Sequence, residues 1–182
     1  MKKLFVVALL ASCLTLPAQE TRREVSHATG NPAIDSKPNS PDVPDVFAVS
    51  GHLERIVVLR FKFGTDLLAG LEKMIAQEKI KNAVILSAVG SVRGYQVHQV
   101  SNRDMPAKLL FVKNPTAPAD IIGMSGMVMN GRVHPHITLA NGDKAFGGHL
   151  EPETTVFTFA IVTLGVLDDT IDMSRFDDPS YR

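Results

Sequence analysis

The chain is predicted to fold as one α+β domain with a mainly antiparallel or mixed β-sheet and one principal helix. Its 182 residues suit a single domain. Its 45% hydrophobic and 21% charged residues are typical of a globular protein. One segment with helical spacing lies among at least seven segments with strand character, and this ratio predicts the α+β class.

Residues 1–18 are predicted to be an export signal. Lys2 and Lys3 precede an apolar run, Leu4–Leu16, which is shorter than the roughly 20 residues that a membrane span needs. Two cleavage sites fit: one before Cys13, which would then carry a lipid, and one after Ala18. The protein is therefore expected to be periplasmic or lipoprotein-anchored, with no membrane contact beyond the signal or that lipid. Cys13 is the only cysteine, so the mature domain has no disulfide and no thiolate ligand.

Residues 19–46 are predicted to be a disordered, proline-rich linker, because they are polar and lack aliphatic periodicity. The composition changes at Phe47, and we place the folded domain at residues 47–182.

The elements of this domain follow from local patterns. Residues 54–63 are rich in β-branched and aromatic side chains and predict a strand. Thr65 or Asp66 can cap a helix whose apolar positions are Leu67, Leu68, Leu71, Met74 and Ile75. Five further strands are predicted at residues 82–89, 90–102 (with a bend at Gly94), 108–112, 120–129 and 156–167.

A histidine-rich hairpin is the most informative feature. Asn141-Gly142 is a strong two-residue hairpin signal. In that register His134 lies opposite His149, and His136 lies opposite Gly147, so all three histidines share one face. A four-residue loop would instead pair His136 with His149 and preserve the cluster. A three-residue loop would move His149 to the other face.

Three imidazoles on one face predict a metal site with the ligands His134, His136 and His149. Zinc, or another divalent transition metal that prefers imidazole, fits three histidines with an open fourth position. Glu151 shares the face of His149 and is the candidate for a supporting partner or a base. Pro135 donates no ladder hydrogen bond, which predicts an edge strand or an outward-facing nitrogen. His98 is interpreted as an ordinary structural or exposed histidine.

The same residues resemble the PPC ("plants and prokaryotes conserved") domain family. The family signature is His-x-His, a turn, Gly-Gly-His-Leu and a hydrophobic strand. Weaker similarities extend the resemblance over residues 54–178. The corresponding segments here are His134–His136, Gly147–Leu150, Val156–Leu164, Gly64–Leu67, Ala83–Gly90 and Ile121–Gly126.

This resemblance implies an α+β fold, a homotrimer with the histidines near subunit contacts, and a bound metal at His134, His136 and His149. Plant members pair the domain with an Arg-Gly-Arg-Pro motif that enters the minor groove of DNA. That motif is absent here, because Gly131-Arg132 is followed by Val133.

We therefore predict an exported, trimeric metal-binding protein that binds a small ligand or acts as an accessory module. One alternative is a metal-dependent hydrolase or lyase that uses an open zinc position, with Glu151 as proton carrier. Another is DNA binding by analogy with the family. Lysine plus arginine equals aspartate plus glutamate at nineteen each, which argues against a nucleic-acid partner, as does export.

Overall fold

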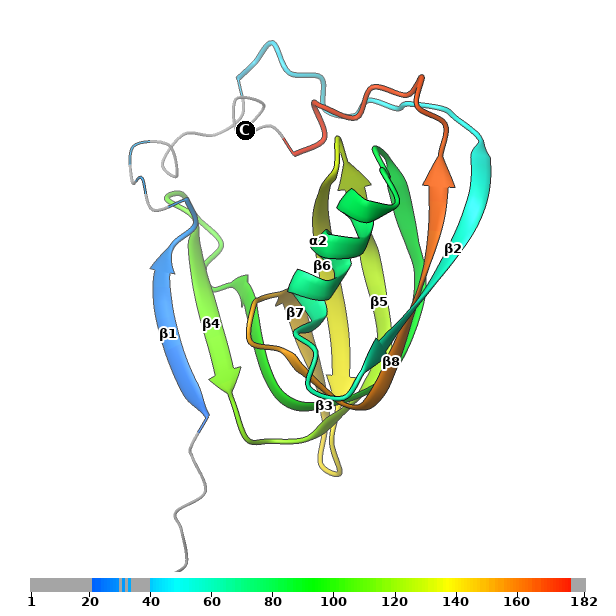
Figure 1. The fold of residues 1–182 in the computed structure, drawn as a ribbon. Helices are drawn as coiled ribbons and strands as arrows, with labels where there is room; N and C mark the ends of the chain where they lie inside the picture. The colour runs from blue at the N-terminus through cyan, green and yellow to red at the C-terminus, as the bar shows by residue number, and fades with distance from the viewer. Residues whose placement is uncertain (1–20, 30, 32, 34–39, 178–182) are drawn as a thin grey trace, which may run out of the picture.

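The computed structural model describes residues 21–29, 31, 33 and 40–177 (Figure 1). The predicted export signal at residues 1–18 lies outside the described residues. The α+β class is confirmed, since eight strands accompany the helix α2 within these residues. In chain order the elements are β1 Arg22–His27, β2 Leu53–Lys62, α2 Leu67–Gln77, β3 Ala83–Val100, β4 Lys108–Asn114, β5 Ala119–Met129, β6 Arg132–Ala140, β7 Ala145–Leu150 and β8 Thr155–Leu167.

The sheet closes on itself around the long strand β3. The first half of β3 pairs with β5, which pairs with β6, and β6 pairs with β7. β7 then returns to the second half of β3, so the four strands form a ring. Two pairs of strands extend from this ring in Figure 1, β8 with β2 on one side and β4 with β1 on the other.

The sequence predicted two strands at residues 82–89 and 90–102, and the structure corrects this to the single strand β3. Its pairing register with β8 shifts between Ile85 and Ser87, between Gly90 and Val92, and between Val92 and Gly94. Such bulges bend a strand without ending it. The expected bend near Gly94 therefore lies inside a continuous strand. This one strand pairs with β5 along its first half and with β7 along its second half.

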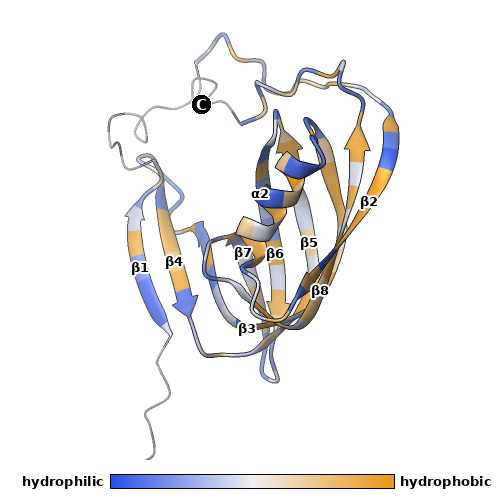
Figure 2. Ribbon diagram, in the orientation of Figure 1, coloured by the Kyte–Doolittle hydropathy of each residue, from blue (hydrophilic) through white to orange (hydrophobic). Residues whose placement is uncertain are grey.

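A second correction concerns the predicted disordered linker at residues 19–46. Arg22–His27 forms β1 and pairs antiparallel with β4 from Arg22↔Lys113 to His27↔Lys108. The side chains of β1 are mostly exposed, so the segment lacks the alternation of apolar residues that marks a half-buried strand. Backbone pairing with the edge of β4 is what orders it. Figure 2 shows the contrast between this largely polar strand and the apolar β8.

The helix α2 is confirmed at Leu67–Gln77. Asp66 caps its N-terminus, because its side chain accepts a hydrogen bond from the backbone N–H of Ala69 at 2.9 Å. The buried residues Leu67, Leu68, Leu71 and Ile75 join side chains of the strands in one core. No helix within the described part of the chain is long and apolar enough to cross a membrane.

Candidate metal centre

The hairpin that carries the histidines has the four-residue loop that the sequence left as an alternative, and not the two-residue loop predicted first. Ala140 pairs with Ala145, so four residues form the loop, and His136 lies opposite His149 while Gly147 lies opposite Thr138. The side chain of Asn141 explains the longer loop, because its oxygen accepts hydrogen bonds from the N–H groups of Asp143 and Lys144, both at 3.0 Å. The observed pairing register differs from the predicted one by two residues, so the three histidines still share one face of the sheet.

A fourth histidine joins the group from β3. His98 pairs directly with His149, and His149 pairs on its other side with His136. The rings of His98 and His149 are stacked with their centroids 4.6 Å apart. Sequence reasoning took His98 for a structural or exposed residue and missed this contact. Nothing in the sequence near position 98 signals it, because it depends on the closure of β7 onto β3.

The tightest potential ligand set is His98, His149 and Glu151. Their ligand atoms all lie within 4.8 Å of one another. The Nδ1 atom of His98 is 2.5 Å from Oε1 of Glu151, and the Nδ1 atom of His149 is 3.5 Å from the same oxygen. The three side chains are only 18–20% exposed. Two imidazoles and a carboxylate are donors typical of zinc and related ions.

The two remaining predicted ligands, His134 and His136, stand directly beside this set. The ring centroid of His134 is 4.7 Å from that of His149, and the ring centroid of His136 is 5.5 Å from it. The structure therefore brings together all three predicted histidines. The closest set nevertheless shares only His149 with the predicted one, and the ligand role of His134 and His136 stays a prediction.

The environment of His149 and His136 favours the neutral imidazole, which is the form that binds metal. Burial, followed by charge repulsion from the nearby His98, His134 and His136, lowers the pKa of His149 to about 4. Burial, followed by repulsion from His134 and His98, also lowers the pKa of His136. Close packing of four imidazoles thus disfavours protonation at the centre of the group.

The carboxylate of Glu151 reaches the site because its backbone is fixed from two sides. The N–H of Glu151 donates to the carbonyl of Gln96 at 3.1 Å. Thr154 is fully buried, and its hydroxyl lies 3.0 Å from the carbonyl oxygens of both Gln96 and Glu151, to which it can donate a hydrogen bond. The same hydroxyl accepts a hydrogen bond from the N–H of Gln96. The turn after β7 is therefore tied to β3 at the level of the site.

Two glycines allow β7 to lie close to both neighbouring strands. A Cβ atom on Gly148 would stand 2.2 Å from the carbonyl oxygen of His98, and one on Gly147 would stand 2.0 Å from that of Ile137. Side chains at either position would push the strands apart. The Gly-Gly pair of the sequence motif thus brings His149 within reach of His98.

The C-terminal segment also reaches the histidine face. Asp177 forms an ion pair with Arg132, and its Oδ2 atom lies 3.5 Å from Nδ1 of His134. This carboxylate stands near the outer side of the cluster, where His134 is 41% exposed.

Of the two alternatives predicted for Pro135, the edge strand is wrong, because β6 pairs with β5 on one side and β7 on the other. The β6–β7 pairing begins only at His136, however, so Pro135 lies just past the end of that ladder. There its missing N–H costs no pairing with β7.

One orphaned atom indicates that a metal fits this group. Among the described buried side chains, the Nδ1 atom of His149 has no hydrogen-bond partner. A buried polar atom without a hydrogen-bond partner is energetically costly and calls for an explanation. A bound metal ion would be one. Together with the two imidazoles and one carboxylate in reach, the residues present suit a divalent transition metal.

The fold and the site define a class: a small, β-rich α+β domain with a cluster of histidines and a carboxylate on one face of its sheet. A family model describes this class as the Plants and Prokaryotes Conserved domain, abbreviated PCC, and matches residues 48–168. The chain belongs to this family, as the sequence motifs indicated.

Known proteins with similar sequence or structure agree with this assignment. A metal-containing protein from Archaeoglobus fulgidus has a TM-score of 0.58 and 21% identity, with 68% of this chain and 86% of that chain covered. A plant- and prokaryote-conserved protein from Pyrococcus horikoshii has a TM-score of 0.51 and 22% identity, covering 69% and 85%. At these identities the likeness concerns the fold.

Two curated relatives are described as the bifunctional protein GlmU from Synechococcus strains. They are 28% and 30% identical to this chain over 132 and 129 residues. The matches cover 70% and 69% of this chain but only 18% and 19% of those proteins. The chain therefore spans less than a fifth of the curated relatives it matches.

Proposed function

We propose that this protein is an exported metal-binding protein whose ion is held by His98, His149 and Glu151, with His134 and His136 beside them. The observation that carries the proposal is that three potential ligand atoms lie within 4.8 Å of one another, beside a buried Nδ1 atom of His149 that has no hydrogen-bond partner. The metal-containing relative from Archaeoglobus fulgidus supports it. Export is proposed from the sequence of residues 1–18 alone, in which two lysines precede a short apolar run.

Zinc is the first candidate for the ion, because imidazole nitrogen and carboxylate oxygen are its common ligands apart from thiolate. When bound, such an ion supplies a Lewis acid that can hold and polarise an oxygen or nitrogen of a small ligand. The protein supplies the neutral imidazole of His149 at pH 7 and a carboxylate whose backbone is held by Gln96 and Thr154. We infer a small-molecule binding or accessory role on this basis.

The metal content of the untagged protein, measured by inductively coupled plasma mass spectrometry, tests the proposal. We expect close to one zinc per chain in the wild type and a loss of most of it in His149→Ala, since both candidate ligand sets contain His149. His98→Ala and His136→Ala separate the two sets: loss in the first variant alone supports His98–His149–Glu151, and loss in the second alone supports the three-histidine set.

His52→Ala is the matched control, because His52 is exposed and lies outside the cluster. It should retain the wild-type metal content, and circular dichroism of each variant checks that it is folded. Full metal retention by a folded His98/His136/His149 triple variant would contradict the proposal.

The other predicted functions have less support. A hydrolase or lyase would need Glu151 as a proton carrier, but this carboxylate lies 2.5 Å from Nδ1 of His98 within the closest ligand set. DNA binding would need a basic surface, whereas the chain has no net charge. Neither alternative is favoured by a feature of the site.

We also propose self-association as a homotrimer, in line with the family resemblance, through an exposed apolar face of the β2–β8–β3 sheet. Large apolar side chains on it are 38–64% exposed, and contiguous apolar surface of this kind marks contact sites. Leu53 and Leu86 both lie within 3.3 Å of the position that a Cβ atom on Gly165 would take, so residues of β2 and β3 share this face. The members of this apolar face are Leu53, Ile56, Val58, Leu86, Val89 and Phe159.

A further inference from the structure

We propose that β1 completes a pocket beside the metal centre for a small carboxylate that also carries a hydroxyl or amino group. Arg22 and Lys113 would bind the carboxylate, and the other end of the ligand would face His98. The inference rests on the proposed metal site and names the class of ligand which that site would take.

The pocket lies on the same face of the sheet as the metal cluster. Strand pairing places Glu24, Phe111, His98, His149 and His136 in one row across five neighbouring strands. Residues in such a row occupy the same face, and neighbouring strands are about 4.8 Å apart. Glu24 therefore stands about 10 Å from His98, with only Phe111 between them.

A second row, two residues along each strand, carries the hydrogen-bond donors. Arg22 pairs with Lys113, and Lys113 pairs with Gln96. The carbonyl of Gln96 in turn accepts the N–H of Glu151. The two rows thus run in parallel from β1 to the metal cluster, one ending at Glu151 and the other at the histidines.

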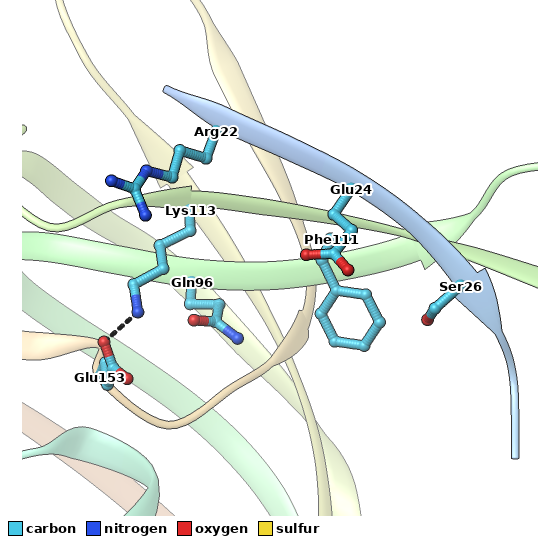
Figure 3. Close-up of a pocket in the computed structure, with 7 residues that line it drawn as sticks. All are labelled: Arg22, Glu24, Ser26, Gln96, Phe111, Lys113 and Glu153. Atoms are coloured by element: carbon cyan, nitrogen blue, oxygen red, sulfur yellow. Dashed lines mark hydrogen bonds and ion pairs between the residues drawn. The ribbon is translucent and has the colours of Figure 1, made fainter. Parts of the chain in front are cut away.

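These residues enclose a cavity of about 480 Å³, which is in the size range of small-molecule sites. Figure 3 shows the guanidinium of Arg22 and the ammonium of Lys113 on one side of it, and the carboxylate of Glu24 above the ring of Phe111 on the other. Glu153, from the turn before β8, forms an ion pair with Lys113 and closes the cavity on that side.

The charges of the lining favour a carboxylate with a second polar group. Within the described part of the chain, the side chain of Arg22 makes no ion pair or hydrogen bond, so its guanidinium is free to bind a carboxylate in a bidentate manner. Glu24 is equally free and can accept a hydrogen bond from a hydroxyl or amino group. Gln96 offers a further amide that both donates and accepts.

Phe111 connects the pocket to the metal cluster. It lines the cavity, and its ring centroid is 5.1 Å from that of His98. A ligand that packs on this ring has its far end next to the imidazole of His98. The cavity and the metal site are therefore neighbours that share the ring of Phe111 as their boundary.

The wall formed by β1 comes from outside the shared domain. The family model matches residues 48–168, and Arg22 and Glu24 precede that segment. The position of β1 against the edge of β4 gives this chain a ligand contact that residues 48–168 alone do not provide.

Isothermal titration calorimetry of the zinc-loaded full-length protein with L-malate tests the proposal. We expect saturable binding that Arg22→Gln weakens by at least about tenfold, the loss of one charge-assisted interaction. Arg23→Gln is the matched control, because it removes the same charge from the opposite face of the same strand. It should bind L-malate like the wild type. Succinate, which lacks the hydroxyl group, should bind more weakly than L-malate.

Zinc analysis of the same samples separates this proposal from the metal site itself. Wild-type protein without zinc would overturn the proposed function. Normal zinc content in Arg22→Gln with unchanged L-malate affinity would overturn the carboxylate pocket alone, as would an equal loss in Arg23→Gln. Equal affinity for succinate and L-malate would overturn the role assigned to the hydroxyl group.

Discussion

At the scale of single residues, His149 is the centre of the site. It pairs with His98 on one side and with His136 on the other, and its Nδ1 atom is buried without a hydrogen bond. Burial lowers its pKa to about 4, so the imidazole is neutral at pH 7 in the folded protein. In the unfolded chain the same group would titrate at its ordinary value of about 6.5.

This difference predicts that the metal-free protein loses stability in acid. The unfolded state binds a proton at His149 more readily than the folded state between about pH 6.5 and 4, so the free energy of unfolding falls as the pH is lowered through that window. The loss from this one residue is on the order of 3 kcal/mol. Urea unfolding of metal-free protein at several pH values measures it.

The variant His149→Asn should flatten this part of the stability profile, since asparagine does not titrate. His52→Asn removes an exposed histidine and should keep the wild-type pH dependence. If His149→Asn and the wild type lost stability in parallel between pH 6.5 and 4, the lowered pKa would not be the cause.

At the scale of elements, local patterns predicted what depends on local chemistry. The helix at Leu67–Gln77 and its Asp66 cap follow from spacing and a side chain that binds a neighbouring N–H. The hairpin of β6 and β7 was predicted, but its loop length depends on two hydrogen bonds of Asn141 that the Asn-Gly pair does not reveal. The predicted register differed from the observed one by two residues, and because side chains alternate along a strand, the histidines still share one face.

Elements that depend on distant partners were not predictable in this way. β1 is ordered by the open edge of β4, about 85 residues further along the chain by its register, and not by its own apolar pattern. His98 enters the site because β7 returns to β3 and closes the ring. The sequence contains each of these residues, but it does not show which strand edges remain free to pair.

The closure of β7 onto β3 gives a prediction for Gly148. Replacing it with alanine would place a Cβ atom 2.2 Å from the carbonyl oxygen of His98 and force the strands apart. We expect Gly148→Ala to lower the free energy of unfolding by about 1–3 kcal/mol, the range for overpacking, and to lower the zinc content.

Chemical denaturation and metal analysis of the same sample provide both measurements. Gly142→Ala is the control, because a Cβ atom at Gly142 meets nothing within 4 Å. Wild-type zinc content in Gly148→Ala would show that the close approach of β7 to β3 is not needed for the site.

At the scale of the whole molecule, the two extensions of the ring have opposite characters. The β4–β1 extension carries polar and charged residues next to the metal cluster and the adjoining cavity. The β2–β8 extension carries the apolar face, where Val58 is 64% and Ile56 is 53% exposed. This division suggests that one side of the molecule binds ligand and the other contacts further copies of the chain.

The apolar face predicts a specific effect of a single charge. Sedimentation equilibrium of the wild type should give three times the mass of one mature chain. Val58→Lys should shift the equilibrium toward monomers, because an ammonium group buried in a subunit contact without a partner is strongly unfavourable. Val100→Lys is the matched control: Val100 is 70% exposed at the end of β3 and is not part of the apolar face, so this variant should stay trimeric. A monomeric wild type, or a Val58→Lys variant as trimeric as Val100→Lys, would show that this face is not the contact.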